Sequence, residues 1–245
     1  MCYHTSLTQQ ENQITAVFDA VYNEPNSYEP YYHFNGWENK YLSIIKQDNE
    51  SIIDLATWGV LPTNFDLSKR TQFLAKTKTL NATKERLFDS NLYSQFIQYQ
   101  KCIIISDGFF EPHTVSATNE KIPYYFKEKN NNLFAFAGIY SVIDDDISSP
   151  IYSASIITIE ANPFFKEIHN KPNKLGSYRM PLILDPTDYW DWLHTSNEDE
   201  TKMLLNTFTK QELTAHPVSK DLFKTSIDTN LPTILNKVEF QKGLF

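Results

Sequence analysis

Four short apolar segments follow one another in the middle of the chain, and they constrain the fold more than any other feature. They are rich in β-branched and aromatic residues, as strands are, and they span residues 101–107, 122–127, 133–140 and 151–160. A similar run at 51–60 ends before Pro62 and predicts a further strand. The sequence Lys-Asn-Asn-Asn at 129–132 predicts a hairpin turn between two of these strands. A largely antiparallel sheet is therefore expected.

Helical patterns lie on both sides of these segments. Apolar residues recur every three or four positions from Ile14 to Tyr22, which predicts an amphipathic helix over 11–23. We expect loops at 31–40 and around Asn81. Further helices are expected over 66–78 and 85–99, and after the cap-and-proline pairs Asn162-Pro163 and Asp185-Pro186. Helices flanking an antiparallel sheet predict one compact domain of the α+β class.

Glycine, cysteine and histidine usage excludes several kinds of site. The 6 glycines never fall in a G-x-G or P-loop spacing, so the common nucleotide-binding loops are absent. Cys2 and Cys102 are the only cysteines, and no two of the 6 histidines lie within five positions, so no disulfide framework and no local metal motif exists. We expect neither a metal nor an organic cofactor. Without a membrane-length apolar run or an N-terminal signal, we expect a soluble, reduced, cytoplasmic protein that does not enter membranes.

Charge is distributed unevenly. The formal net charge is -8, which argues against coating nucleic acid through bulk electrostatics. Segments 66–86 and 166–179 are nevertheless basic, and they hold all three arginines, Arg70, Arg86 and Arg179. Arginine suits phosphate recognition, so a local anion site forms if the fold brings these segments together. The alternative is two separate solvated faces.

Cys2 has a chemistry that no interior cysteine has, provided that Met1 is removed. Its free α-amine would have a pKa near 8, which leaves roughly a tenth of it unprotonated at neutral pH. Such an amine captures an aldehyde as a Schiff base, and the neighbouring thiol can then close a thiazolidine ring. The alternative is a small residue near a frayed terminus.

Three other polar residues are candidates for a site. Glu111 follows an apolar segment, so we expect it at a strand end, either as a proton donor and acceptor or as a surface acid. His169 follows a short predicted helix, where it is either a proton shuttle or a helix cap. Asn81 is either a hydrogen-bonding orienter or a loop residue that binds its own backbone.

Six segments in order make a more specific pattern. They are MCYH at 1–4, TWGVLP at 57–62, LNATKE at 80–85, CIIISDGFFE at 102–111, FAFAGIY at 134–140, and SIITIEANPFFKEIH with RMPLIL at 155–169 and 179–184. This pattern resembles the SRAP family, the SOS response-associated peptidase or abasic-site processing proteins. The resemblance implies a single SRAP domain over 1–245, with a barrel-like sheet and flanking helices.

The resemblance also implies a function in the DNA damage response. Proteins of this family bind single-stranded DNA that contains an abasic site, and their N-terminal cysteine forms a thiazolidine with the deoxyribose aldehyde. By position, Cys2 matches the nucleophile of the family. Asn81 and His169 match the residues that hold the sugar, and Glu111 and His169 match the residues that assist proton transfer. Arg179 matches an arginine that contacts phosphate. The resemblance implies a crosslinking, lyase-like enzyme that works without metal or cofactor, and we expect a monomer.

The chain departs from the family pattern at three places. Thr83 stands where the family has an arginine, so Lys84 or Arg86 would replace that phosphate contact, with Arg70 as another candidate. The segment between His169 and Arg179 is longer than usual, and Pro112-His113 stands where an aromatic residue often follows the glutamate. Three aromatic residues are candidates either for stacking on bases or for the core: Trp58, Phe109 and Phe110.

Two other functions remain open at this point. One is an N-terminal-cysteine hydrolase, an autoproteolytic peptidase or amidase, as the family label suggests. The other is a single-strand binding module that makes no covalent bond, which the loss of an arginine at Thr83 makes conceivable.

Overall fold

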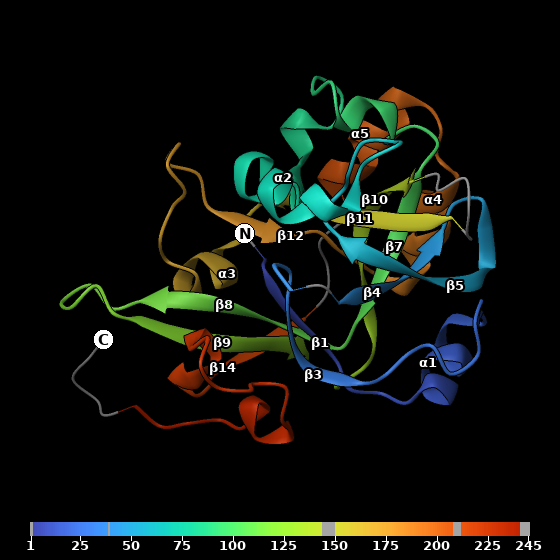
Figure 1. The fold of residues 1–245 in the computed structure, drawn as a ribbon. Helices are drawn as coiled ribbons and strands as arrows, with labels where there is room; N and C mark the ends of the chain where they lie inside the picture. Colours follow the sequence, from blue (N-terminus) through green and yellow to red (C-terminus); the bar gives the residue numbers. More distant parts are fainter. Residues whose placement is uncertain (1, 39, 144–149, 208–211, 241–245) are drawn as a thin grey trace.

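The computed structural model describes residues 2–38, 40–143, 150–207 and 212–240 (Figure 1). The helices and strands follow one another as β1 (His4–Leu7), α1 (Glu11–Phe18), β2 (Val21–Tyr22), β3 (Tyr31–Asn35), β4 (Tyr41–Lys46), β5 (Asn49–Trp58), α2 (Arg70–Thr77), β6 (Asn81–Thr83), β7 (Lys101–Ser106), β8 (Gly108–Thr114), β9 (Lys121–Glu128), β10 (Phe134–Ile143), β11 (Ile151–Glu160), α3 (Pro163–Ile168), β12 (Arg179–Pro181), β13 (Ile183–Leu184), α4 (Tyr189–His194), α5 (Glu198–Thr207) and β14 (Leu213–Pro217).

The first sheet has five strands in the order β14-β9-β8-β1-β3, and all neighbours are antiparallel. Strand β1, which begins two residues after Cys2, is enclosed between β8 and β3. His4 pairs with Phe110 on one side and with Asn35 on the other. The start of the chain is therefore held inside a sheet by strands from two distant parts of the sequence.

The second sheet follows the order β12-β11-β10-β7-β4-β5-β2, with β13 beside β10 and β6 beside β11. A parallel pairing between β11 and β5 closes five of these strands into a ring, β5, β4, β7, β10 and β11. Strand β2 pairs in parallel with β5, and β6 pairs in parallel with β11. The remaining neighbours are antiparallel. Figure 1 shows this sheet above the first one, with α2, α4 and α5 around it. The expected α+β class with a largely antiparallel sheet is confirmed.

Aromatic side chains pack where the first sheet meets α3. Phe109 stacks on Phe126 with ring centroids 5.0 Å apart, and Phe165 of α3 lies 5.0 Å from Phe126 and 6.2 Å from Phe109. All three side chains are fully buried. This cluster fixes α3 against β8 and β9, since buried aromatic rings contribute the largest packing areas in a core.

The N-terminal helix is shorter than the predicted span of 11–23. It ends at Phe18 because Asp19 adopts a left-handed conformation, with φ of 51°. That conformation stops the helical hydrogen-bond ladder. Val21 and Tyr22, which the helical periodicity included, form β2 instead.

Three segments form strands that were not predicted. The predicted loop at 31–40 contains β3, and the region of Asn81 forms β6. Strand β8 was not expected, and it places Glu111 within a strand rather than at a strand end. Polar residues stand among the apolar ones in these segments, which hides the alternation typical of strands.

Residues 85–99 do not form the predicted surface helix. The chain makes only short 3₁₀ turns there, at Lys84–Arg86 and Tyr93–Gln95. The Ser90 hydroxyl accepts a hydrogen bond from the main-chain N–H of Leu92, the kind of local bond that competes with a helix. Apolar residues of this segment are buried in the core without a helix: Leu87, Tyr93, Phe96 and Ile97.

The turn at 129–132 does not close a hairpin. Strand β9, which precedes it, pairs with β8 and β14, whereas β10, which follows it, pairs with β7, β11 and β13. The turn therefore carries the chain from one sheet to the other. Turn residues predict a change of direction, but they do not specify which strands pair.

Candidate functional site

Cys2 is fully buried at the entrance to β1. Its thiol donates a hydrogen bond from Sγ to the carbonyl oxygen of His4, at 3.6 Å. Its own carbonyl oxygen accepts a 2.8 Å hydrogen bond from Nδ2 of Asn81. Both the side chain and the main chain of Cys2 are therefore held in place, which argues against a frayed terminus.

The Cys2 thiol is protonated at neutral pH. Burial raises its pKa well above the ordinary value, and the nearby Glu111 carboxylate acts in the same direction because a negative charge opposes formation of a thiolate. Resting thiolates are typical of cysteines that attack directly, and they need a positive environment. At Cys2, burial and Glu111 outweigh the charge of the N-terminus, which lowers the pKa, so the thiol is suited to react after another group has activated the substrate.

The short helix α3 positions His169. Asn162 caps the helix, because its Oδ1 accepts a hydrogen bond from the N–H of Phe165 at 2.8 Å. His169 is the residue at the other end, where its own N–H bonds to the carbonyl of Phe165 at 2.8 Å. The next residue, Asn170, bonds through its side chain to both the N–H and the carbonyl of Thr114 in β8. The helix and the segment after it are thus tied to β8, the strand that carries Glu111.

Glu111 and His169 form a pair. Oε2 of Glu111 lies 3.3 Å from Nδ1 of His169, and the carbonyl oxygen of Pro112 lies 3.2 Å from the same nitrogen. A carbonyl can only accept, so Nδ1 carries the proton. Burial lowers the pKa of His169, although Glu111 opposes this, and the ring is therefore neutral at neutral pH. Its Nε2 is then an unprotonated acceptor, which is the form that a general base requires.

Asn81 faces Cys2 from the other sheet. It lies at the start of β6 and is 5% exposed, and its main-chain carbonyl accepts a hydrogen bond from the Tyr93 hydroxyl. Its Nδ2 is used on Cys2, whereas its Oδ1 is buried and has no hydrogen-bond partner among the described residues. A buried acceptor without a partner is costly, so this oxygen is available to a donor on the N-terminal amine or on a substrate.

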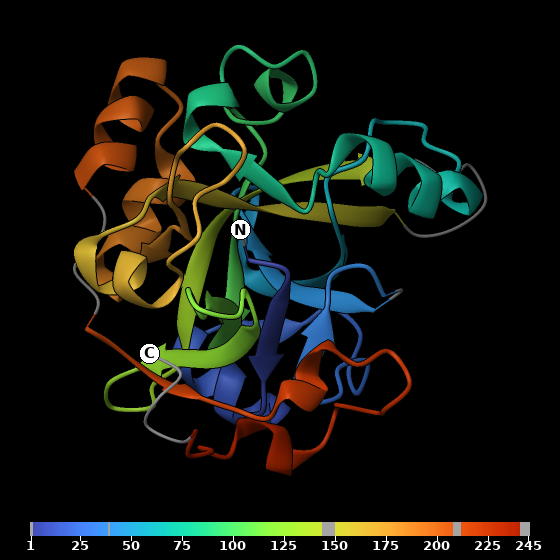
Figure 2. The same cartoon turned by 90° about the vertical axis from the view of Figure 1, so that its left-hand side faces the viewer.

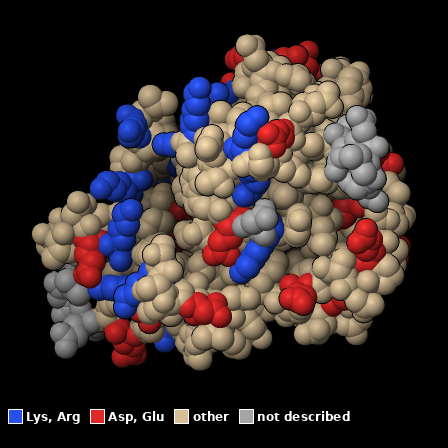
Figure 3. All heavy atoms as spheres, in the orientation of Figure 1, with Lys and Arg blue, Asp and Glu red and all other residues tan. Residues whose placement is uncertain are grey.

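A groove of about 720 Å³ opens onto the Glu111 and His169 pair, and neither Cys2 nor Asn81 is among the residues that line it. Glu111, His169 and Arg179 line it together with Tyr3 and His4. Two lysines of its lining, Lys121 and Lys171, are exposed. Figure 3 shows that Lys and Arg side chains gather on the left of this face of the molecule, while many acidic residues lie elsewhere. The groove is suited to an anionic ligand.

A family model described as SOS response associated peptidase (SRAP) matches residues 1–225. The chain belongs to the SRAP family. Abasic site processing protein YoqW of Bacillus subtilis is 28% identical to this SRAP protein over 222 residues, which cover 89% of this chain and 92% of the relative. Abasic site processing protein YMR114C of Saccharomyces cerevisiae is 27% identical over 201 residues, 79% of this chain and 50% of the relative. A crystal structure of a Bacteroides thetaiotaomicron protein superposes with a TM-score of 0.82 at 26% identity, covering 97% of this chain and 100% of the other.

Arg179 lines the groove of the SRAP protein, but two nitrogens of its guanidinium already donate hydrogen bonds within the protein. Its Nη1 donates to Oε1 of Glu85 at 2.8 Å, and its Nη2 donates to the carbonyl of Thr158. Its Nε is buried without a partner in the described part of the chain. The expected phosphate contact of Arg179 stays a prediction, and Glu85 is the group that such a contact would have to displace.

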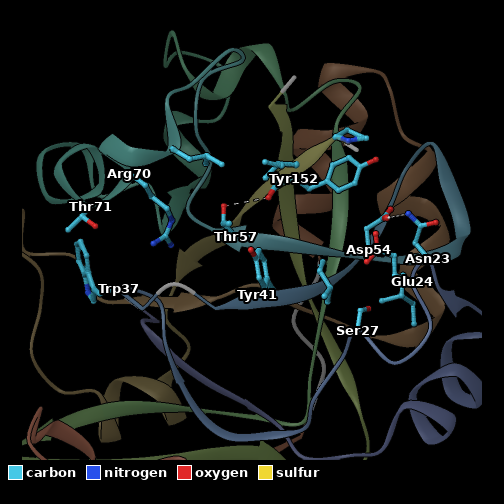
Figure 4. Close-up of a pocket in the computed structure, with 15 residues that line it drawn as sticks. Asn23, Glu24, Ser27, Trp37, Tyr41, Asp54, Thr57, Arg70, Thr71 and Tyr152 are labelled. Atoms are coloured by element: carbon cyan, nitrogen blue, oxygen red, sulfur yellow. Dashed lines mark hydrogen bonds between the residues drawn. The ribbon is translucent and has the colours of Figure 1, made fainter. Parts of the chain in front are cut away.

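Arg70 lies in a second pocket, of about 610 Å³ (Figure 4). Arg70 is 5% exposed, and its guanidinium donates to the carbonyls of Trp58 at 2.6 Å, and of Gly36 and Glu38 at 3.3 Å each. Figure 4 shows Arg70 at the same end of this pocket as Trp37. The SRAP groove therefore does not include Arg70. Its guanidinium ties α2 to these carbonyls, and its expected DNA contact stays untested.

Lys84 and Arg86 lie on the surface next to Asn81. Nζ of Lys84 donates to Oδ1 of Asn206 in α5 at 3.0 Å, and Arg86 lies over the ring of Tyr93. Neither lines the groove. Trp58, Phe109 and Phe110 are fully buried, so these aromatic residues belong to the core rather than to a stacking surface.

Sequence reasoning missed most of the residues that line the groove of this SRAP protein. Tyr3, His4, Lys121 and Lys171 are among them. His4 had a usable signal, because residues two apart on an extended segment share a face and Cys2 was already a candidate. No group of three or more His, Cys, Asp or Glu side chains that could hold a metal occurs in the described part of the chain. None of the described helices is long and apolar enough to cross a membrane.

Proposed function

We propose that this SRAP protein processes abasic sites in single-stranded DNA by joining them covalently to Cys2 once Met1 has been removed. The names of its relatives, abasic site processing proteins, support the substrate. One observation carries the proposal: Glu111, which is paired with His169, acts electrostatically on the thiol of a buried Cys2 whose carbonyl is held by Asn81. The groove beside this pair is large enough for a nucleotide and has basic residues in its lining.

The amine reacts first in the proposed mechanism. The α-amine of Cys2 adds to the aldehyde carbon of the ring-opened deoxyribose and gives a carbinolamine. Nε2 of His169 accepts the proton that the amine loses and returns it to the hydroxyl group, which leaves as water. The product is an imine between Cys2 and the sugar. The buried Oδ1 of Asn81 orients the amine by accepting one of its N–H bonds.

The thiol reacts second. Its raised pKa keeps it protonated until the imine forms. Sulfur then adds to the imine carbon, the Glu111 carboxylate takes the thiol proton, and the imine nitrogen receives that proton from Glu111. The overall reaction consumes one amine, one thiol and one aldehyde, and it releases one water. The five-membered thiazolidine ring ties the protein to the DNA.

The two other functions predict different chemistry. A cysteine hydrolase attacks an amide directly with sulfur and depends on a thiolate, which burial and Glu111 disfavour at Cys2. A binding module without covalent chemistry would not need the neutral, unprotonated Nε2 of His169. The arrangement of the site therefore favours amine-first capture of an aldehyde.

A single experiment separates the three functions. Purified protein is incubated with a single-stranded oligonucleotide that contains one uracil and has been treated with uracil-DNA glycosylase, and the products are run on a denaturing gel. We expect an adduct that survives heating, and mass spectrometry should show loss of Met1 and of one water. An untreated oligonucleotide is the control. Release of a cleaved amide without an adduct would support a hydrolase, and a native gel shift without an adduct would support a binding module.

A further inference from the structure

His4 takes part in a chain of hydrogen bonds that leads away from the groove. Its Nδ1 lies 2.8 Å from Nε2 of His33 in β3, and Nδ1 of His33 lies 2.6 Å from the hydroxyl of Thr229. The second ring nitrogen of His4, Nε2, has no hydrogen-bond partner among the described residues, and the ring lines the groove beside Glu111. The chain therefore has one open end, and that end is in the proposed DNA site.

The rings are fixed by their neighbours. His4 stacks on His33 with centroids 5.1 Å apart, and Phe223 contacts it edge-on at 6.0 Å. Oδ1 of Asn230 accepts hydrogen bonds from the main-chain N–H groups of Tyr32, at 2.8 Å, and His33, at 3.3 Å. Figure 2 shows the C-terminal segment, in red, beside the blue strands β1 and β3. Thr229 and Asn230 lie beyond residue 225, where the match to the family model ends.

Both imidazoles are neutral at physiological pH. Burial lowers the pKa of His4 to about 4 and that of His33 to about 3. Each ring then carries a single proton, and the chain of three groups has two arrangements. In one, the Thr229 hydroxyl donates to His33, His33 donates to His4, and Nε2 of His4 carries a proton. In the other, every donor and acceptor is exchanged, and Nε2 of His4 is an acceptor.

The surroundings favour a proton on Nε2. The Glu111 carboxylate acts on His4 in the direction that attracts a proton. The groove has Lys121, Lys171 and Arg179 in its lining, which suit the oxygen acceptors of a DNA backbone. An acceptor at His4 would repel such oxygens, whereas a donor would bind one.

We propose that His4 is a DNA-binding residue that donates from Nε2 to a backbone oxygen of the abasic nucleotide, with His33 and Thr229 as positioning residues that set its tautomer. This inference rests on the proposed function of the groove. His4 supplies a directional hydrogen bond without a charge, in contrast to the lysines around it. The segment beyond the family match thereby determines a donor in the site.

The direct test is spectroscopic and uses the unmodified protein. Two-bond ¹H–¹⁵N spectra at neutral pH report which nitrogen of each histidine ring carries the proton. We expect the proton on Nε2 in both His4 and His33. A proton on Nδ1 of His4 would overturn the proposal.

The second test compares Thr229→Val with Thr229→Ser. The probe is a single strand with one tetrahydrofuran residue, an abasic analogue without an aldehyde, so binding is measured without capture. Thr229→Val removes the donor and lets the His33 proton move to Nδ1, so we expect binding to weaken about 2- to 10-fold, the range for one hydrogen bond. Thr229→Ser should bind like the wild type. Equal binding by both variants would overturn the proposal, and the Asn230 contacts keep β3 in place in both.

The third test concerns charge. His4→Phe keeps a ring between His33 and Phe223, so we expect weaker probe binding but an unchanged dependence of log Kd on log salt. Lys171→Ala is the comparison, and its slope should fall by roughly 0.7 for one lost phosphate contact. A similar fall for His4→Phe would show a cationic His4 and overturn the proposal. Failure of the proposed function gives a different result: the wild type would form no adduct with an abasic aldehyde. The effects on binding of the tetrahydrofuran probe would still be measurable in that case.

Discussion

Asn81 donates a 2.8 Å hydrogen bond to the main-chain carbonyl of Cys2, across 79 positions of the sequence. The bond joins the two sheets, because Asn81 begins β6 beside the strand ring and Cys2 precedes β1 in the five-stranded sheet. Glu111 also belongs to the five-stranded sheet, and Arg179 lies in the other. The candidate site therefore exists only while the two sheets are packed together.

Asn81→Asp should slow adduct formation about 10- to 100-fold. The substitution keeps the shape of the side chain but replaces the donor to Cys2 with an oxygen that repels the carbonyl, and an unsatisfied buried group costs about 1–3 kcal/mol. The rate is measured in single-turnover reactions with an abasic strand. Asn12→Asp makes the same chemical change on the exposed face of α1 and should leave the rate unchanged. An unaffected rate in Asn81→Asp would contradict an orienting function for Asn81.

Cys2→Ser should keep the amine and lose the stable linkage. Its imine with the abasic sugar should dissociate on heating, and it should be retained on a denaturing gel only after reduction with borohydride. The wild-type adduct should be stable without a reductant. A serine variant that forms an equally heat-stable adduct would exclude the thiazolidine step.

Glu111→Gln should slow adduct formation by roughly 100-fold or more, because a positioned proton-transfer group contributes about 10² to 10⁴ in rate. The amide no longer accepts the thiol proton, so the imine should accumulate and be trapped by borohydride early in the reaction. Removing the carboxylate also takes away one cause of the raised Cys2 pKa, so that pKa should fall. Glu212→Gln, at an exposed ion pair with Lys129, is the matched control.

Raising the salt concentration should weaken binding of the strand and slow capture at low protein concentration, because phosphate contacts release counterions. Lys121→Ala and Lys171→Ala should each weaken binding and reduce the salt dependence. Lys129→Ala removes an exposed lysine that does not line the groove and should behave like the wild type. Binding that is indifferent to salt would argue against an electrostatic groove.

Acid should destabilise the protein through His4 and His33. Their folded-state pKa values of about 4 and about 3 lie below the ordinary value of 6.5, so the unfolded chain takes up protons that the native state refuses. Their contribution is complete above pH 6.5 and is lost as the pH falls towards 4 and 3, on the order of 3 kcal/mol for His4. Urea unfolding between pH 7 and pH 4 measures this loss. His33→Gln, which cannot titrate, should show a flatter profile; an equally steep one would show that other groups cause the loss.

Sequence patterns were sufficient to predict several strands of the second sheet and to name the main candidate residues of the site. The apolar segments that predicted strands at 101–107, 133–140 and 151–160 are β7, β10 and β11, because strands buried on both faces read as continuous apolar runs. Cys2, Asn81, Glu111 and His169 were candidates because of their side-chain chemistry and their positions, and the ordered family motifs, rather than periodicity, gave them a common function. The structure brings Asn81 to Cys2 and His169 to Glu111.

The remaining features depend on contacts between distant parts of the chain. The aromatic residues of Tyr31–Asn35 are compatible with a strand, but its partner is β1 and its hydrogen bonds to Asn230 span almost 200 positions, and no local pattern specifies such distant partners. Likewise, α5 and β14 were not predicted, and β14 forms by pairing with β9. The expectation for Arg70 followed from charge alone, and charge does not tell whether a guanidinium faces solvent or carbonyl groups.

The bonds from Thr229 and Asn230 to β3 have a practical consequence for anyone trimming this protein. A fragment cut back to residue 225, where the family match stops, would lose both anchors while retaining every recognised motif. Such a fragment could be purified, pass as the whole catalytic unit, and still give a misleading affinity. Boundaries for recombinant fragments are better drawn beyond Val238, whose main-chain N–H donates to the carbonyl of Pro217 in β14.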